Sequence, residues 1–122
     1  MAKPRNGSGP GLEDNLKKAV TEMLVLSLLE QEDMHAIQLT QELERQSGEA
    51  ISIVFPYSAL YRLISAGHII EAYKKNAPDG RRRQYFQITE EGRTYVRELR
   101  KVYRRFSGGV ELLLKGGEDH GE

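Results

Sequence analysis

A group of side chains in the middle of the chain could bind a polyanion, and none of these side chains is acidic. They belong to a predicted helix and to a predicted hairpin after it: Tyr57, Ser58, Tyr61, Arg62, Lys74, Lys75, Arg81, Arg82 and Arg83. Hydroxyl and guanidinium groups hydrogen-bond to base edges, and cations contact phosphates. We therefore predict that these residues bind double-stranded DNA, with the helix in the major groove and the hairpin on the backbone.

The charge of the chain supports this prediction only when it is divided by segment. Lys and Arg together number 18, as do Asp and Glu, so the formal net charge is +0. Residues 12–50 carry a net charge of −6, residues 51–105 carry +7, the last 17 residues carry −3, and the first 11 carry +2. Such asymmetry indicates a polyanion-binding surface. The alternative is that the helix surfaces are charged without any such role.

Hydrophobic spacing predicts three helices ahead of the hairpin. Apolar residues recur at steps of three and four over about 12–30, 34–46 and 56–67, which is the period of a helix. Residues 51–55 are typical of a short extended segment, and Pro56 is suited to open the third helix. This helix presents its polar residues on the face opposite Leu60 and Leu63. The alternative is an ordinary amphipathic helix whose tyrosines pack at the rim.

The hairpin is predicted from two strand-like segments and a turn. Residues 69–75 and 82–88 are rich in β-branched and aromatic residues, and residues 76–80 (NAPDG) have turn composition. Three helices followed by a basic hairpin is the order of a winged helix-turn-helix. We therefore predict a mainly α fold with a small β-hairpin and a long C-terminal helix. A solvated hairpin tip that is basic by chance is the alternative.

The C-terminal helix carries an apolar stripe that the small domain leaves uncovered. Thr89 is suited to cap this helix, and Glu90 and Glu91 lie in its first turn. A second copy of the chain would cover the stripe and would match a palindromic operator. The predicted dimer interface contains Leu16, Val20, Tyr95, Leu99, Val102, Tyr103, Phe106 and Leu113. Two alternatives are that the helix folds back onto its own domain, or that Gly108-Gly109 kinks or ends it.

The composition excludes several other classes of function. The chain has no cysteine, so thiolate metal sites and cysteine nucleophiles are absent, and its three histidines lack metal-ligand spacing. We expect no enzyme activity, no catalytic residues, no metal, no cofactor, no membrane contact and a cytoplasmic location. The expected segments are a flexible arm (1–11), a winged helix-turn-helix (12–88), a dimerisation helix (89–115) and a flexible acidic tail (116–122).

Several stretches together resemble the PadR family of bacterial transcriptional regulators, in its short form with a single C-terminal helix. They span about residues 12–110: 21–29 (TEMLVLSLL), 34–37 (MHAI), 42–43 (EL), 57–63 (YSALYRL), 67–70 (GHII), 80–86 (GRRRQYF) and 88–93 (ITEEGR). Three features depart from the family pattern: Ala36-Ile37 stands where a Gly-Tyr pair is usual, Phe55-Pro56 is an uncommon entry to the third helix, and a Gly108-Gly109 pair falls within the expected dimer helix.

The resemblance implies a homodimeric DNA-binding repressor that a small molecule relieves. It implies DNA contacts from Tyr57, Ser58, Tyr61 and Arg62, with Arg82 and Arg83 on the backbone. It also implies that a flat aromatic ligand stacks on Tyr103, with Val20 and Met23 nearby. The alternative is that Tyr103 is a plain dimer-core residue. The alternative function is a winged-helix module that binds a ligand or a protein and has no primary DNA role.

Overall fold

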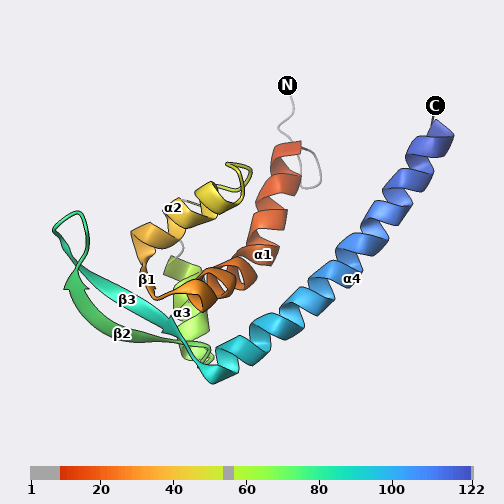
Figure 1. The fold of residues 1–122 in the computed structure, drawn as a ribbon. Coiled ribbons are helices and arrows are strands. Elements are labelled where there is room, and N and C mark those ends of the chain that lie inside the picture. The colour runs from red at the N-terminus through yellow and green to blue at the C-terminus, as the bar shows by residue number, and fades with distance from the viewer. Residues whose placement is uncertain (1–8, 54–56, 122) are drawn as a thin grey trace.

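The protein has a winged helix-turn-helix body and one long helix that leaves it. A computed structural model describes residues 9–53 and 57–121. The elements run in the order α1 (Gly9–Gln31), β1 (Met34–His35), α2 (Ala36–Gln46), α3 (Tyr57–Ser65), β2 (Ile69–Asn76), β3 (Arg82–Ile88) and α4 (Glu90–Gly121). Figure 1 shows α4 starting beside the base of the β2–β3 hairpin and running away from the body, while the tip of this hairpin lies on the opposite side. The predicted fold class is confirmed.

The core lies where the second half of α1 meets α2, α3 and the sheet. Val25, Leu26 and Leu29 of α1 are almost completely buried, and so are Leu60 and Leu63 of α3. This half of α1 is apolar nearly all round because other elements cover it on several sides. Each fully buried leucine contributes about 1.5–3 kcal/mol of transfer free energy. Because Leu60 and Leu63 hold one face of α3 in the core, the opposite, polar face of this helix is exposed to solvent.

A short third strand corrects the predicted start of the second helix. Met34 and His35 pair with Phe86 and Tyr85 of β3, so the sheet has the order β1-β3-β2. The helix begins only at Ala36, because His35 is extended and its side-chain Nδ1 accepts the backbone N–H of Gln38 at 3.2 Å. A side chain that accepts a backbone N–H from the first turn of a helix is an N-cap, and the N-cap residue itself is not helical. His35 therefore ends the extended segment and caps the helix.

The hairpin, which forms the wing of the fold, has nearly the predicted bounds. Its turn is closed by the backbone N–H of Ala77, which donates to the carbonyl of Arg81 at 2.8 Å. Gly80 has a φ of +84°, a conformation that residues with a Cβ seldom adopt. Asp79 accepts the backbone N–H of Arg81 at 3.0 Å and so stabilises the same turn. The residues that predicted a turn at 76–80 are therefore the ones that form it: Gly80 adopts the positive φ and Asp79 accepts the backbone N–H.

The C-terminal helix continues through Gly108 and Gly109. The prediction that this pair might kink or end the helix is not supported, because α4 is continuous from Glu90 to Gly121. Residues 116–121, expected to form a flexible tail, belong to the helix as well. Of the predicted extended segment, residues 51–53 have no regular structure, while residues 54–56, including Pro56, lie outside the described residues. Most of the predicted N-terminal arm is likewise outside them, and α1 begins at Gly9.

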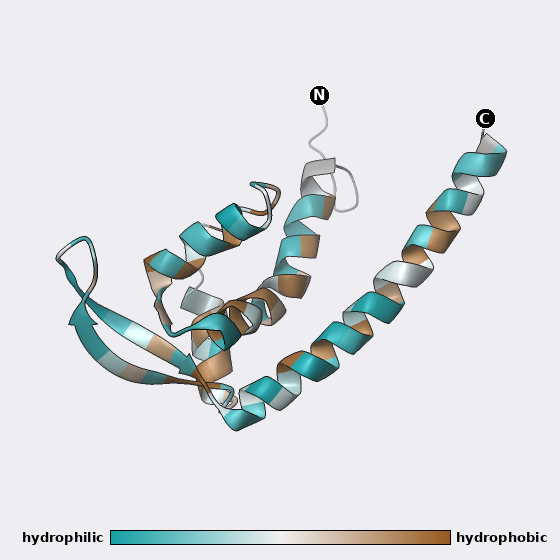
Figure 2. Cartoon of the chain, in the orientation of Figure 1, coloured by the Kyte–Doolittle hydropathy of each residue, from teal (hydrophilic) through white to brown (hydrophobic). Residues whose placement is uncertain are grey.

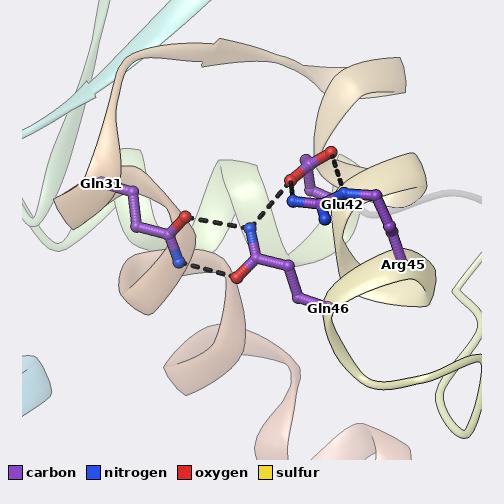
Figure 3. A network of polar contacts seen from close by, with 4 residues as sticks. All are labelled: Gln31, Glu42, Arg45 and Gln46. Atoms are coloured by element: carbon purple, nitrogen blue, oxygen red, sulfur yellow. Dashed lines mark hydrogen bonds and ion pairs between the residues drawn. The ribbon is translucent and has the colours of Figure 1, made fainter.

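A polar network joins the ends of α1 and α2 (Figure 3). The amides of Gln31 and Gln46 donate to each other at 2.9 Å, and Gln46 also donates to Glu42 at 2.8 Å. Arg45 donates to both carboxylate oxygens of Glu42, at 3.0 and 2.6 Å. These donors, Arg45 first and Gln46 second, lower the pKa of Glu42 to about 2. The Gln31–Gln46 pair therefore links α1 to α2, and Gln46 in turn is held by the Glu42 carboxylate on its own helix.

None of the described helices combines the length and apolar character needed to cross a membrane.

Candidate nucleic-acid interface

The polar face of α3 is solvent-exposed along its length. Tyr57 is 45% exposed and Tyr61 is 61% exposed, and Ser58 and Arg62 are exposed beside them. Leu60 and Leu63 point the other way, into the core. A nine-residue helix thus presents two large aromatic side chains at the surface. The face combines hydroxyl donors and acceptors with one guanidinium group.

Arg62 has a partner that the sequence pattern did not predict. Its Nε donates to the carboxylate of Glu22 on α1, 2.6 Å away, and the two side chains remain partly exposed. Glu22 lies 40 positions earlier in the chain. No local pattern signals a pair at that separation, since only the packing of α1 on α3 brings the two residues together. The guanidinium group of Arg62 therefore lies on the exposed polar face of α3 and at the same time forms an ion pair with α1.

The five wing cations divide into two groups according to their surroundings. Lys74, Arg81 and Arg82 are exposed, and within residues 9–53 and 57–121 their side chains form no ion pair. Arg83 has a side chain that is only 21% exposed and an ion pair to Asp79 at 2.7 Å. The Nζ of Lys75 lies over the ring of Tyr85, 4.7 Å from its centroid. Lys74, Arg81 and Arg82 are thus the wing cations whose charge is least engaged within the chain.

The wing and α3 meet at one groove. A depression of about 210 Å³ is lined by Tyr57 from α3, by Arg82 and Gln84 from β3, and by residues 35–37 at the start of α2. Helix N-termini attract anions through their free N–H groups and dipole. Residues that are 25 positions apart in the sequence, Tyr57 and Arg82, therefore border the same surface next to an electropositive helix end. The groove therefore brings Tyr57 of the predicted helix beside Arg82 and Arg83 of the predicted hairpin, whereas the other predicted DNA-binding residues do not line it.

His35 is the titratable group at the centre of this region. Burial lowers its pKa, the positive charge of Arg83 lowers it further, and Asp79 opposes these effects. Its ring also meets Tyr85 edge-on, with centroids 5.4 Å apart. In the sequence His35 stood out only as part of a family motif, and its role as the cap of α2 was not predicted. The lowered pKa favours the neutral ring, and the hydrogen bond from Gln38 assigns Nδ1 as its acceptor nitrogen.

The predicted dimer residues fall into two environments. Leu16 on α1 and Val102, Tyr103, Phe106 and Leu113 on α4 are exposed, with Phe106 at 72% and Leu113 at 80%. Tyr95 and Leu99 instead pack partly against the core of their own chain, and Val20 is half-buried. Figure 2 shows apolar bands recurring along α4 between polar ones. The far part of α4 therefore exposes an apolar stripe, whereas its near part is anchored to the body.

The three residues expected to contact a ligand line one groove. Val20, Met23 and Tyr103 border a depression of about 320 Å³ between α1 and α4, together with Glu22, Tyr95 and Phe106. The floor is apolar and aromatic, and Glu22 supplies a carboxylate. No group of three or more His, Cys, Asp or Glu side chains within the described residues could hold a metal ion.

Comparison with known proteins identifies relatives over most of the chain. Residues 25–98 match the "Transcriptional regulator PadR-like family". An uncharacterised protein X of Lysinibacillus sphaericus is 26% identical over 96 residues, which cover 78% of this chain and 88% of that protein.

Solved structures show the same fold. A PadR family transcriptional regulator from Eggerthella lenta is 27% identical with a TM-score of 0.70, and the match covers 86% of this chain and 90% of the other. A PadR-like transcriptional regulator from Bacillus cereus is 26% identical with a TM-score of 0.68, over 82% of this chain and 96% of the other.

Proposed function

Because the chain belongs to the PadR-like family of transcriptional regulators, we propose that it is a homodimeric repressor that binds a palindromic operator and releases it when a small aromatic ligand binds. Members of this family are regulators that bind DNA, not enzymes. We further expect the protein in the cytoplasm, because the genome that it would regulate lies there.

The observation that carries the proposal is the shared groove of α3 and the wing. Tyr57 and Arg82 border it, and the exposed hydroxyl-bearing face of α3 continues from it. An α-helix fits the major groove of B-DNA, where hydroxyl and guanidinium groups read base edges. We assign this reading to Tyr57, Ser58, Tyr61 and Arg62. Lys74, Arg81 and Arg82 contact phosphates beside the groove, with Lys75 and Arg83 behind them.

The exposed stripe of α4 supports the homodimer. Val102, Phe106 and Leu113 recur at steps of four and seven, which places them on one side of a helix. In the single chain they lie in water, so burial against a second copy contributes favourable free energy. Two-fold symmetry would then present two α3 helices to two half-sites of DNA. Leu16, Val20, Tyr95, Leu99 and Tyr103 complete the proposed interface.

The groove between α1 and α4 supports a ligand site. Tyr103 offers a ring face, and Val20 and Met23 offer apolar contacts on the opposite wall. The same groove borders the proposed dimer stripe, so a ligand bound there would favour one dimer geometry over another. Different affinity for the two geometries is what couples a ligand to DNA release.

Salt-dependent DNA binding tests the proposal. Operator fragments would be selected from genomic DNA with the protein, and the dissociation constant measured by fluorescence anisotropy at several salt concentrations. We expect Arg82→Ala to weaken binding to all sequences and to reduce the salt slope by about one unit for each phosphate that the variant no longer neutralises. Tyr61→Ala should instead change which sequences are preferred.

The matched control for the wing variant is Arg97→Ala, which removes an exposed arginine from α4. It should leave the salt slope close to that of the wild type. An unchanged slope in Arg82→Ala would contradict the assignment of the wing, and a uniform loss across sequences in Tyr61→Ala would contradict base reading by α3. If no duplex is bound at low salt, the DNA-binding function itself is wrong for this chain.

A further inference from the structure

The junction between the DNA-binding body and α4 is tied by several contacts within a few residues. The backbone N–H of Thr89 donates to the carbonyl of His68 at 3.0 Å, and its hydroxyl donates to the carbonyl of Gly67 at 2.7 Å. The same hydroxyl oxygen accepts the N–H of Gly92 at 3.0 Å. Thr89 therefore caps α4 and at the same time fastens its first turn to the segment that joins α3 to β2.

An aromatic stack lies directly behind this cap. The rings of His68 and Tyr95 are nearly parallel, at 8°, with centroids 4.1 Å apart. The Nδ1 atom of His68 is buried, and no hydrogen-bond partner for it occurs among the described residues. A buried polar atom without a partner opposes this arrangement, so other contacts must hold the ring in place. The stack on Tyr95 is the contact that does so.

Gly92 brings the two backbones together at the same point. A Cβ atom at this position would collide with the carbonyl oxygen of His68 and would lie 2.8 Å from Cγ1 of Ile88. Only glycine permits the first turn of α4 to approach the α3–β2 turn this closely. Because backbone rather than a flexible side chain lies in the way, the distance between these two segments has little room to vary.

A second anchor holds α4 further along. Arg100 pairs with Glu30 of α1 and also donates to the hydroxyl of Ser27 at 3.1 Å. Beyond Arg100, the side chains of Lys101 to Phe106 are exposed. Two points fix the direction of a rod, and here the junction at residues 89–95 and the anchor at Arg100 fix the direction of α4 relative to α3.

Small changes of this direction become large at the far end of α4. The helix extends 21 residues past Arg100, about 30 Å at 1.5 Å per residue. A tilt of about 5–10° would move its end by about 3–5 Å, which is comparable to the 3.4 Å rise of one base pair. The same tilt, applied to both copies in a dimer that α4 holds together, would change the separation of the two α3 helices.

We propose that His68, Thr89, Gly92 and Tyr95 form a rigid joint that sets the distance between the two α3 helices of the dimer, and so determines which half-site spacing the protein accepts. The four residues are positioning residues, because they act on DNA through the orientation of α3. This inference rests on the proposed function as a homodimeric DNA-binding protein, and its experiment separates the two.

Pulsed electron paramagnetic resonance measures the joint directly. The chain has no cysteine, so Ser65→Cys on the exposed face of α3 gives one spin label per copy and one distance across the dimer. Tyr95→Phe keeps the ring and should retain the distance distribution of the labelled wild type. Tyr95→Leu removes the stack, and we expect its distribution to broaden or shift by about 3 Å or more. An unchanged distribution in Tyr95→Leu would overturn the proposal.

The second readout is a series of operators whose half-sites are moved apart or together by one base pair. We expect wild type and Tyr95→Phe to lose at least about tenfold in affinity for the altered spacing, and Tyr95→Leu to lose less than about threefold. Equal penalties in all three proteins would contradict the joint. Because Tyr95 also belongs to the proposed dimer interface, both measurements are repeated with His68→Leu, which removes the other ring of the stack and lies outside that interface. The joint requires the same change in both variants, and a change in Tyr95→Leu alone would contradict it. A monomer in sedimentation would refute the dimer itself, whereas a dimer with an unchanged distance refutes only the joint.

Discussion

At the scale of single residues, the sequence predicted which side chains of α3 are exposed but not which contacts hold them. Tyr61 and Arg62 were placed on a polar face by helical spacing, and both are exposed in the structure. Helical spacing also placed Leu60 and Leu63 in the core. The pair between Arg62 and Glu22 and the cap formed by His35 depend on contacts between elements. Periodicity describes a residue's own helix and carries no information on such contacts.

The Glu22–Arg62 pair should oppose DNA binding, because Glu22 competes with phosphate for the same guanidinium group. We expect Glu22→Gln to tighten operator binding by about two- to fivefold, the range of a partly exposed ion pair. The measurement is a double-mutant cycle with Arg62→Ala, and Glu13→Gln is the control for loss of an exposed acid on α1. If Glu22→Gln tightens binding equally when Arg62 is absent, the effect comes from general charge and not from this pair.

His35 should make stability depend on pH. Burial and Arg83 lower its pKa in the folded chain, so the unfolded chain binds the proton first as the pH falls. The stabilisation is complete above the unfolded pKa of 6.5 and is lost as the pH falls from there through the folded pKa. Protonation also blocks the Nδ1 acceptor that caps α2.

Urea unfolding at pH 7.5 and at pH 5.5 measures this effect. The wild type should lose more stability over this interval than His35→Asn, which retains a capping acceptor but does not titrate there. The same loss in both proteins would mean that other groups cause the pH dependence.

At the scale of elements, patterns with a local physical cause were predictable. The wing followed from turn chemistry at residues 76–80, and α3 followed from its apolar face. The strand at Met34–His35 was missed because its partners in β3 lie 50 or more positions later in the chain. The sequence left open whether the last helix continues through Gly108-Gly109, and α4 does continue through them. Glycine lowers helix propensity, yet the backbone hydrogen bonds of a long helix persist through it.

Replacing the glycine pair in α4 by alanine should increase the stability of the folded chain. A Cβ at Gly108 or at Gly109 would meet no described atom within 4 Å, and neither residue has a positive φ. We expect Gly108→Ala with Gly109→Ala to stabilise the folded chain by about 0.5–1 kcal/mol for each substitution. Thermal unfolding by circular dichroism measures the change. Gly80→Ala is the opposite control, since its φ of +84° disfavours alanine and should lower the midpoint. A lower midpoint in the α4 variant would contradict a continuous helix.

At the scale of the whole molecule, the proposed function requires two copies. The single chain leaves an apolar stripe on α4 in water and contains one α3 helix, whereas a palindromic operator has two half-sites. The sequence predicted this stripe from its spacing. It did not separate Tyr95 and Leu99, which are partly buried in their own chain, from Phe106 and Leu113, which are free to meet a partner.

A charge substitution at Phe106 tests whether two copies of the chain associate through α4. Phe106→Glu places a charge in the centre of the exposed stripe, and burying an unpaired charge in an interface is strongly unfavourable. We expect sedimentation to give a monomer whose circular dichroism is close to that of the wild type, with operator binding weakened at least about 100-fold. Thr94→Glu is the matched control, because it also converts an exposed uncharged residue of α4 into an acid. A Phe106→Glu protein that remains a dimer would place the interface elsewhere.

A hydroxyl-radical footprint on the DNA that flanks the protein's own gene measures the proposed mode of DNA binding most directly. We expect two protected half-sites related by a two-fold axis, with centres about 10 base pairs or a multiple of that apart. The protection should disappear with Phe106→Glu and weaken with Arg82→Ala. Absence of protection, uniform protection without sequence preference, or a single asymmetric half-site that survives Phe106→Glu would contradict a dimer that reads DNA with α3 and the wing.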